Sequence, residues 1–343
     1  MHRLLRLTAA FVGVLLLAMV ALIAFTEPTP AESDVTVLAG PGIAHGAIDA
    51  VPAPLGWTPP DWFPDEARSD LWVLENLDQA PTHRWGPKVR APAGIIADLD
   101  RGEVLWARDP DASRSIASVT KLVSSLTLMS YDADLDREVC LGLEQWPTRP
   151  GARSKFETGD CYAGWEYLGA ALVASDNRGA FAMPAIADQD YFDFVDKMGE
   201  VADELGLRAA SFADPAGLED ENMASARDIL KAVTAVSVHP VLNGVASAPV
   251  WRIDTRRGPR VLNTTNRILA LSLTPPKKKF VPPPFATLAA KTGYTDTAHY
   301  CFAIVAESLS TGRRYGAVLL GAPNNSARFD DMLAMLNWAD KER

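Results

Sequence analysis

A serine and a lysine stand three residues apart in residues 116–122, which read Ile-Ala-Ser-Val-Thr-Lys-Leu. If a helix begins here, one turn places Ser118 and Lys121 on the same face. A serine hydroxyl is a weak nucleophile until a nearby base takes its proton. A lysine can be that base if burial or a neighbouring cation lowers its pKa. The pair therefore predicts a serine nucleophile with a lysine as its general base.

Two later motifs strengthen this prediction, because Ser-x-x-Lys alone is common on helix surfaces. Residues 175–177 read Ser-Asp-Asn, and residues 291–293 read Lys-Thr-Gly. The three motifs occur together, in this order, in penicillin-binding proteins and class A β-lactamases. Three ordered matches at domain-scale spacing are much harder to obtain by chance than one.

The bulk properties exclude several other classes of function. The chain has 343 residues, a formal net charge of −10 and a sequence pI of about 5.1, which argues against a nucleic-acid partner. We expect no metal site, because no Cys-x-x-Cys or paired-histidine spacing occurs and the histidines are scattered. These are His2, His45, His83, His239 and His299.

The N-terminal segment, residues 1–26, predicts export. Residues 7–26 carry no charge and follow Arg3 and Arg6, so they are long enough to span a bilayer with the basic end inside. The competing interpretation is a signal peptide cleaved after Ala31. Both place the rest of the chain in the cell envelope, on the extracytoplasmic side, and the first adds a membrane as partner.

Residues 27–90 are rich in proline and predict a semi-rigid tether, although short apolar stretches within them could dock on the folded part. Residues 91–343 predict the catalytic domain. Alternating or apolar runs indicate strands, and 3.6-residue periodicity indicates helices. Expected strands are 93–97, 103–107, 138–141, 161–163, 300–306 and 315–320; expected helices start at 118 and span 166–174, 187–205, 225–238 and 326–338. The pattern favours an α+β fold, a mainly antiparallel sheet flanked by helices with a helical insertion.

About residues 91–340 resemble the low-molecular-mass penicillin-binding proteins, which are serine D-Ala-D-Ala peptidases. Besides the three motifs, residues 212–218 read Phe-Ala-Asp-Pro-Ala-Gly-Leu and residues 222–228 read Asn-Met-Ala-Ser-Ala-Arg-Asp, and both are similar to family stretches. Residues 263–266, Asn-Thr-Thr-Asn, resemble a turn that precedes Lys-Thr-Gly in the family. The resemblance implies a β-lactamase/DD-peptidase-like fold and no cofactor.

The resemblance also implies the roles of the site residues. Ser118 would attack the carbonyl of the penultimate D-Ala of a peptidoglycan stem peptide, and a neutral Lys121 would take its proton. Lys291 would supply a cation that lowers the pKa of Lys121, Ser175 would relay a proton to the leaving amine, and Asn177 would orient Lys121. Gly293 would let a substrate strand approach the backbone, and the N–H groups of Ser118 and Tyr294 would form the oxyanion hole. Thr292 and Arg314 would bind the terminal carboxylate.

The second motif and its neighbours place the chain nearest the DD-endopeptidase branch of the family, which cuts D-Ala–diaminopimelate cross-links. Residues 175–180, Ser-Asp-Asn-Arg-Gly-Ala, carry this resemblance, and β-lactam antibiotics would be covalent inhibitors. A β-lactamase-like hydrolase or esterase and an inactive wall-binding scaffold are the alternatives. No Glu-x-x-Leu-Asn run lies between Asn177 and Lys291, which argues against fast antibiotic hydrolysis.

The three cysteines fit an exported protein. The resemblance pairs the strands around Cys140 and Cys161 as a hairpin and so implies a disulfide between them. Cys301 lies in an apolar strand and is expected to stay a buried free thiol.

Overall fold

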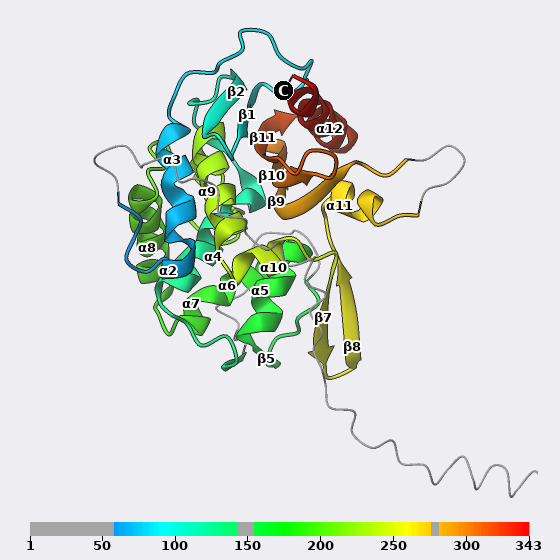
Figure 1. Cartoon of the computed structure of the whole chain (residues 1–343). Coiled ribbons are helices and arrows are strands. Elements are labelled where there is room, and N and C mark those ends of the chain that lie inside the picture. The colour runs from blue at the N-terminus through cyan, green and yellow to red at the C-terminus, as the bar shows by residue number, and fades with distance from the viewer. Residues whose placement is uncertain (1–57, 141, 143–153, 276–280, 343) are drawn as a thin grey trace, which may run out of the picture. The chain divides into compact units, whose positions relative to one another are not determined.

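The described part of the chain is organised around a five-stranded antiparallel sheet (Figure 1). A computed structural model describes residues 58–140, 142, 154–275 and 281–342. The strand order is β2-β1-β11-β10-β9, and every pairing is antiparallel. The strands are β1 (Ala93–Asp98), β2 (Glu103–Arg108), β9 (Phe285–Thr295), β10 (His299–Ser308) and β11 (Arg314–Ala322). The predicted antiparallel α+β architecture is confirmed.

The sheet is covered on both faces because its side chains alternate between two hydrophobic clusters. In β10, Ala303 and Val305 join one cluster and Phe302 and Ile304 join the other. Helix α12 (Asn325–Lys341) supplies the second cluster, whereas α9 (Ala226–Val238) lies in the first. This double burial explains why β10 and β11 read as nearly continuous apolar runs.

The remaining helices extend the first cluster into a helical region beside one edge of the sheet (Figure 1). They are α4 (Lys121–Ser130), α5 (Gly164–Val173), α6 (Asn177–Phe181), α7 (Met183–Ile186), α8 (Tyr191–Glu204) and α10 (Leu242–Ala246). The short helix α11 (Arg267–Ser272) instead contributes Ile268 to the second cluster. Ser225 caps α9, with its side chain accepting from the Asp228 backbone N–H and the Asp228 carboxylate accepting from the Ser225 backbone N–H. The hairpin of β7 (Val250–Thr255) and β8 (Gly258–Asn263) was not predicted.

Folded structure is already present within residues 58–77, ahead of residue 91, where the sequence predicted the catalytic domain to begin. Short helices α2 (Asp65–Arg68), η1 (Ser69–Trp72) and α3 (Val73–Asn76) bury Ala67, Leu71 and Leu74 in the first cluster, and Phe63 and Leu77 beside them join it. These apolar side chains are too few and too widely spaced to show a helical period, but together they cover α9. Residues 58–77 are therefore part of the domain, and the expected tether applies at most to residues before them.

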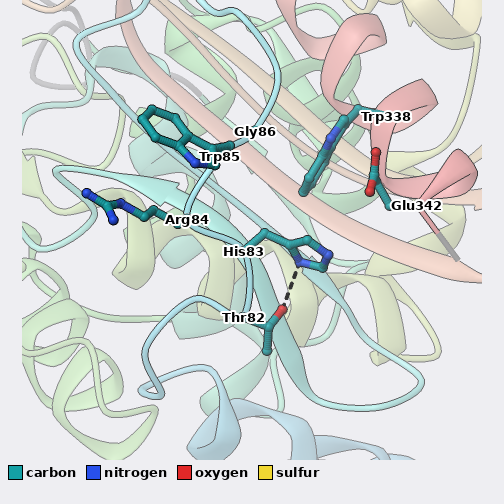
Figure 2. A pocket seen from close by; sticks show the side chains of 7 residues that line it. All are labelled: Thr82, His83, Arg84, Trp85, Gly86, Trp338 and Glu342. Carbon is teal, nitrogen blue, oxygen red and sulfur yellow. Dashed lines mark hydrogen bonds between the residues drawn. The ribbon is translucent and has the colours of Figure 1, made fainter.

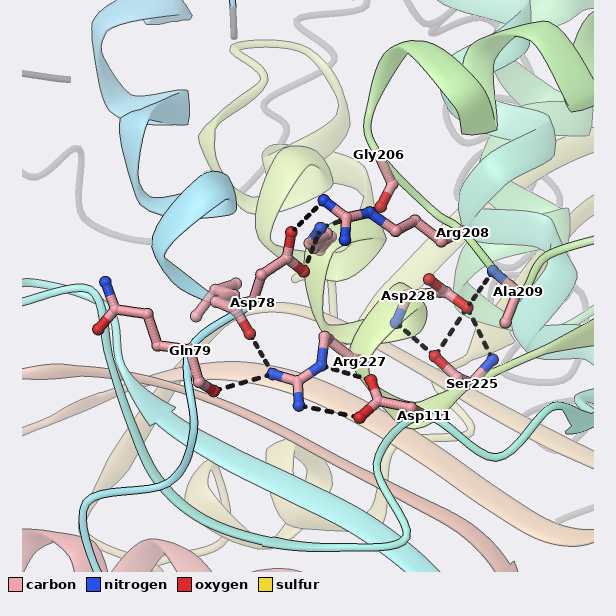
Figure 3. Close-up of polar contacts among 11 residues, drawn as sticks. Asp78, Gln79, Asp111, Gly206, Arg208, Ala209, Ser225, Arg227 and Asp228 are labelled. Carbon is pink, nitrogen blue, oxygen red and sulfur yellow. Dashed lines mark hydrogen bonds and ion pairs between the residues drawn. The ribbon is translucent and has the colours of Figure 1, made fainter. Parts of the chain in front are cut away.

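Polar contacts hold this N-terminal segment on α9 (Figure 3). Arg227 donates to the carbonyl oxygens of Leu77 and Gln79 and forms an ion pair with Asp111. Lys231 lies 2.7 Å from the Asp78 carboxylate, and its side chain is only 3% exposed. A buried cation that loses its partner costs several kcal/mol (about 3–5), so these contacts fix the position of the segment.

A disulfide joins Cys140 of β4 (Glu138–Cys140) to Cys161 of β5 (Cys161–Ala163), and Cys301 is a buried free cysteine. Both predictions are confirmed. The cross-link restricts the unfolded chain by closing a loop with a sequence separation of 21. We expect a Cys140→Ser/Cys161→Ser variant to lose about 3 kcal/mol of unfolding free energy, measured by urea denaturation. An unchanged midpoint and slope would contradict this expectation.

Within the described ranges, no helix is long and apolar enough to cross a membrane. The predicted segment 7–26 and the alternative cleavage site at Ala31 lie outside these ranges. Across residues 58–140, 142, 154–275 and 281–342, no cluster of three or more His, Cys, Asp or Glu side chains is arranged to hold a metal ion.

Candidate active site

Ser118 lies in a tight turn that precedes helix α4. The turn is a 3₁₀ helix, η2 (Ala117–Thr120), and α4 begins at Lys121, so the α-helix expected from residue 118 starts three residues later. Ala117 adopts a positive φ of 49°, and Ile116 donates its backbone N–H to Asn222 O. This backbone places Ser118 one turn before Lys121, as the spacing predicted.

The Lys121 amine lies among three oxygen atoms. Its Nζ is 2.8 Å from Ser118 Oγ, and it donates to Asn177 Oδ1 at 2.9 Å and to Ala216 O at 2.7 Å. A neutral amine has two N–H bonds and one lone pair. When the amide and carbonyl oxygens take the two N–H bonds, the lone pair points at Ser118 Oγ. The contacts thus orient Lys121 to accept the serine proton.

Burial makes this acceptor role possible near neutral pH. The Lys121 side chain is fully buried, which lowers its pKa to about 7, while the charges of Asp214 and Asp176 oppose the shift. The main cause is desolvation, one of the two causes that the sequence allowed, whereas the family resemblance had implied the charge of Lys291.

The second motif contributes one side chain to each lysine. Ser175, at a positive φ of 58°, accepts from Lys291 Nζ at 2.7 Å, and Asn177 opens α6 beside Lys121. Between them, Asp176 caps α6 by accepting from two backbone N–H groups, those of Arg178 and Gly179. The cap explains why an aspartate separates the two site residues.

Lys291 on β9 completes the arrangement, but its electrostatics differ from the expectation. It is buried and donates to Ser175 Oγ and to Thr292 O at 2.8 Å. Burial and the charges of Lys121 and Arg328 lower the pKa of Lys291 well below its ordinary value. The sequence assigned a full positive charge to Lys291. Burial, and to a lesser degree the charge of Lys121, therefore disfavour the protonated form of Lys291.

Gly293 is required because the backbone of the Ser118 turn approaches it closely, whereas the sequence analysis expected the approach of a substrate strand. A Cβ at this position would lie 2.7 Å from Ile116 O and 3.2 Å from Val119 N. The glycine thus lets β9 pack against the Ser118 turn itself, rather than leaving room only for substrate. Next to it, Thr292 Oγ1 donates to Thr265 Oγ1 at 2.7 Å. Tyr294 is 49% exposed and donates to Asp296 Oδ1.

Arg314 does not belong to the site, which corrects the sequence-based assignment. Arg314 on β11 lies opposite Glu307 on β10, and Glu307 lies opposite Ala286 on β9. Ala286 is five residues before Lys291 on β9, so Arg314 is both two strands away from β9 and displaced along the strands from Lys291. Its guanidinium forms an ion pair with Asp100 at 2.7 Å. The register of the sheet, which composition does not determine, places this arginine near the other end of the strands.

The loop that supplies Ala216 O to Lys121 was not recognised as part of the site. The buried Asp214 carboxylate accepts from the Asn222 side chain at 2.8 Å and from four backbone N–H groups, those of residues 216–219, at 2.6–2.9 Å. One side chain therefore folds the whole loop. The only signal in the sequence was its turn-forming composition, Asp-Pro-Ala-Gly, within a stretch that resembles the family.

Arg328 of α12 is a second residue that sequence reasoning missed. It donates to Gly293 O at 2.8 Å and to Cys301 O at 3.2 Å, so it braces the end of β9 nearest Ser118. Burial lowers its pKa to about 10. No motif surrounds Arg328 in the sequence, and its position follows only from the packing of α12 on the sheet.

The fold is that of the DD-peptidases and penicillin-binding proteins. A D-alanyl-D-alanine carboxypeptidase from Mycobacterium tuberculosis superimposes with a TM-score of 0.66 at 22% identity, over 77% of this chain and 96% of that chain. A penicillin-binding protein from Listeria monocytogenes, solved with cefotaxime bound, gives a TM-score of 0.62 at 23% identity, over 75% and 100% of the two chains.

Sequence comparison identifies the family. The sequence model of the D-alanyl-D-alanine carboxypeptidase family matches residues 79–324, and the chain belongs to that family. A D-alanyl-D-alanine endopeptidase of Escherichia coli is 23% identical over 263 residues, which cover 74% of this chain and 78% of that protein. The resemblance inferred from the motifs is confirmed.

Proposed function

We propose that this chain is a serine DD-peptidase that cleaves the bond after D-alanine in peptidoglycan stem peptides through an acyl-enzyme on Ser118. The observation that carries the proposal is the 2.8 Å contact between Ser118 Oγ and Lys121 Nζ, with both N–H bonds of a neutral amine directed to other acceptors. This arrangement supports proton transfer from Ser118 to Lys121 at neutral pH.

The reaction begins when Ser118 Oγ attacks the substrate carbonyl carbon and its proton moves to Lys121. The backbone N–H groups of Ser118 and Tyr294 stabilise the resulting oxyanion. Ser175, held by Lys291, gives its hydroxyl proton to the leaving amine as the C–N bond breaks, and the proton that Lys121 took from Ser118 replaces it, so Lys121 is neutral again. Water then hydrolyses the serine ester. With Arg314 removed from the site, the linked hydroxyls of Thr292 and Thr265 are the remaining groups for the terminal carboxylate.

The enzyme acts in the cell envelope, where its substrate lies. Residues 7–26, uncharged and preceded by two arginines, support a membrane anchor in the N-terminal segment, with a cleaved signal peptide as the alternative. β-Lactams imitate the stem peptide and inhibit by acylating Ser118.

We further propose that the enzyme cleaves D-Ala–diaminopimelate cross-links at least as well as it removes terminal D-Ala. The Ser-Asp-Asn-Arg sequence of residues 175–178 supports the endopeptidase branch. An endopeptidase must admit a bulky group on the leaving side, and we assign Tyr294, which is half exposed near the end of β9, to the wall on that side.

The test is the ratio of kcat/KM for a cross-linked muropeptide dimer to that for a monomeric pentapeptide. We expect a ratio of one or more, with Ser118→Ala as the blank for both substrates. A hundredfold preference for the pentapeptide, about 2.7 kcal/mol of transition-state discrimination, would show that the branch assignment is wrong while leaving the peptidase chemistry intact.

A further inference from the structure

A shallow pocket of about 420 Å³ lies at the opposite edge of the sheet from the Ser118 site. Its floor is the segment before β1, where the backbone N–H groups of Thr82 and His83 donate to Val104 O and Leu105 O of β2. Because β2 and β9 are the two outer strands, four strand spacings of about 4.8 Å each separate the pocket from β9. The volume falls within the range of small-molecule sites, about 300–1,000 Å³.

Two indole rings flank this pocket, with His83 between them (Figure 2). Trp85 is 79% exposed, an unusual position for so large an apolar side chain. Trp338 of α12 forms the other wall. Its ring meets the His83 imidazole edge to face, with 5.3 Å between the two ring centroids. The two rings therefore offer flat apolar surfaces to a ligand that enters from solvent.

The backbone holds Trp85 in this position. The hydrogen bonds to β2 fix the two residues before Arg84, and Gly86 follows Trp85 directly. A Cβ on Gly86 would overlap the Trp106 indole of β2, so only glycine lets the chain pass here. The exposed indole is thus presented from a loop that the sheet edge supports on both sides, not from a free chain end.

The charges around the rings indicate a neutral polar ligand. Arg84 lies 5.4 Å from the Trp85 ring centroid, and Glu342 lines the other side of the pocket. One cation and one carboxylate nearly cancel, so neither an anion nor a cation is strongly favoured. Both groups, with Thr82 and His83, can hydrogen-bond hydroxyl or acetamido groups. Flat apolar faces with a polar rim match a pyranose ring, whose C–H face is apolar and whose edge is polar.

We propose that this pocket binds the N-acetylated sugars of a peptidoglycan glycan strand, remote from the bond that is cut. The inference rests on the proposed function, because the glycan strand carries the stem peptides that reach Ser118. Bound sugar would hold the enzyme on the polymer while peptides attached to neighbouring positions or strands enter the active site.

The experiment titrates the full chain with N,N′,N″,N‴-tetraacetylchitotetraose and with glycan strands stripped of peptides by an amidase, using calorimetry. We expect the wild type to bind both and Trp85→Ala to weaken binding at least fivefold. Phe192→Ala, which removes another exposed aromatic side chain (73% exposed) on α8, should bind like the wild type. Ser118→Ala should also bind like the wild type.

Failure of this inference is distinguishable from failure of the proposed function. Trp85→Ala should keep its thermal midpoint and its rate of acylation by penicillin. No binding of either probe to the wild type, a loss below fivefold in Trp85→Ala, or an equal loss in Phe192→Ala would overturn the sugar site. If penicillin did not acylate the wild-type protein, the peptidase assignment would be overturned instead.

Discussion

Replacing Ser118 by alanine will abolish covalent labelling by a fluorescent penicillin and will reduce peptide hydrolysis by roughly 10⁴–10⁶-fold. The substitution removes the only atom that forms the ester, whereas Lys121 keeps its acceptors on Asn177 and Ala216, so the site should stay folded. The measurement is gel fluorescence after labelling, together with peptide mass spectrometry of the labelled wild type.

A neighbouring serine provides the matched control. Ser125 lies on α4, which follows the Ser118 turn directly, is fully buried, and donates its hydroxyl to Leu122 O. Ser125→Ala should label at the wild-type rate. Label that persists in Ser118→Ala, or that maps to another serine in the wild type, would show that the nucleophile has been assigned wrongly. Rapid release of the label from the wild type would favour the β-lactamase alternative.

Lys121 should make acylation strongly dependent on pH. Its pKa is lowered to about 7 by burial, so it is protonated below pH 7 and cannot take the Ser118 proton, and it becomes neutral above that pH. The acylation rate constant for penicillin should therefore rise with pH, by about tenfold per unit below the pKa, and level off above it. The Lys121→Met variant lacks this base, so its acylation rate constant should be about 10²–10⁴-fold lower. Its rate should also no longer change with pH near pH 7.

Lys231 offers a control for the cost of altering a buried lysine. It is buried on α9 outside the site, with Asp78 as its ion-pair partner. Lys231→Met should lower the thermal midpoint but keep the wild-type pH profile. If Lys121→Met retained the step near pH 7, the titrating base would be a different group, with Lys291 the next candidate.

The catalytic cluster could be predicted because short-range spacing encodes it. Ser118 and Lys121 are joined by one turn, and Ser175 and Asn177 flank a helix cap, so each motif keeps its geometry wherever the fold places it. That the three motifs come together in one site was predicted from the resemblance to a family, because the spacing of the motifs along the chain does not show it. Core strands such as β10 were visible for a different reason, since apolar side chains on both faces leave a continuous run.

Other features could not be predicted because they depend on long-range packing. Arg314 was misplaced because strand register depends on tertiary contacts. The Ala216 carbonyl carries no side-chain signature, and Arg328 reaches β9 only through the docking of α12. The helices at residues 65–76 were missed because each is a single turn whose stability comes entirely from burial against α9.

The position of β9 at the end of the sheet has a consequence for solubility. In the described ranges β9 pairs only with β10, whereas the other outer strand, β2, has Thr82 and His83 bonded along its free side. An unpaired strand edge can pair with the same edge of another molecule and start aggregation. The Ser118 turn packs against β9 at Gly293, and residues 289–293 are all buried, so this part of the edge is covered in the folded protein. Substitutions that displace the Ser118 turn from Gly293 should therefore uncover more of the β9 edge and increase the tendency of the protein to self-associate.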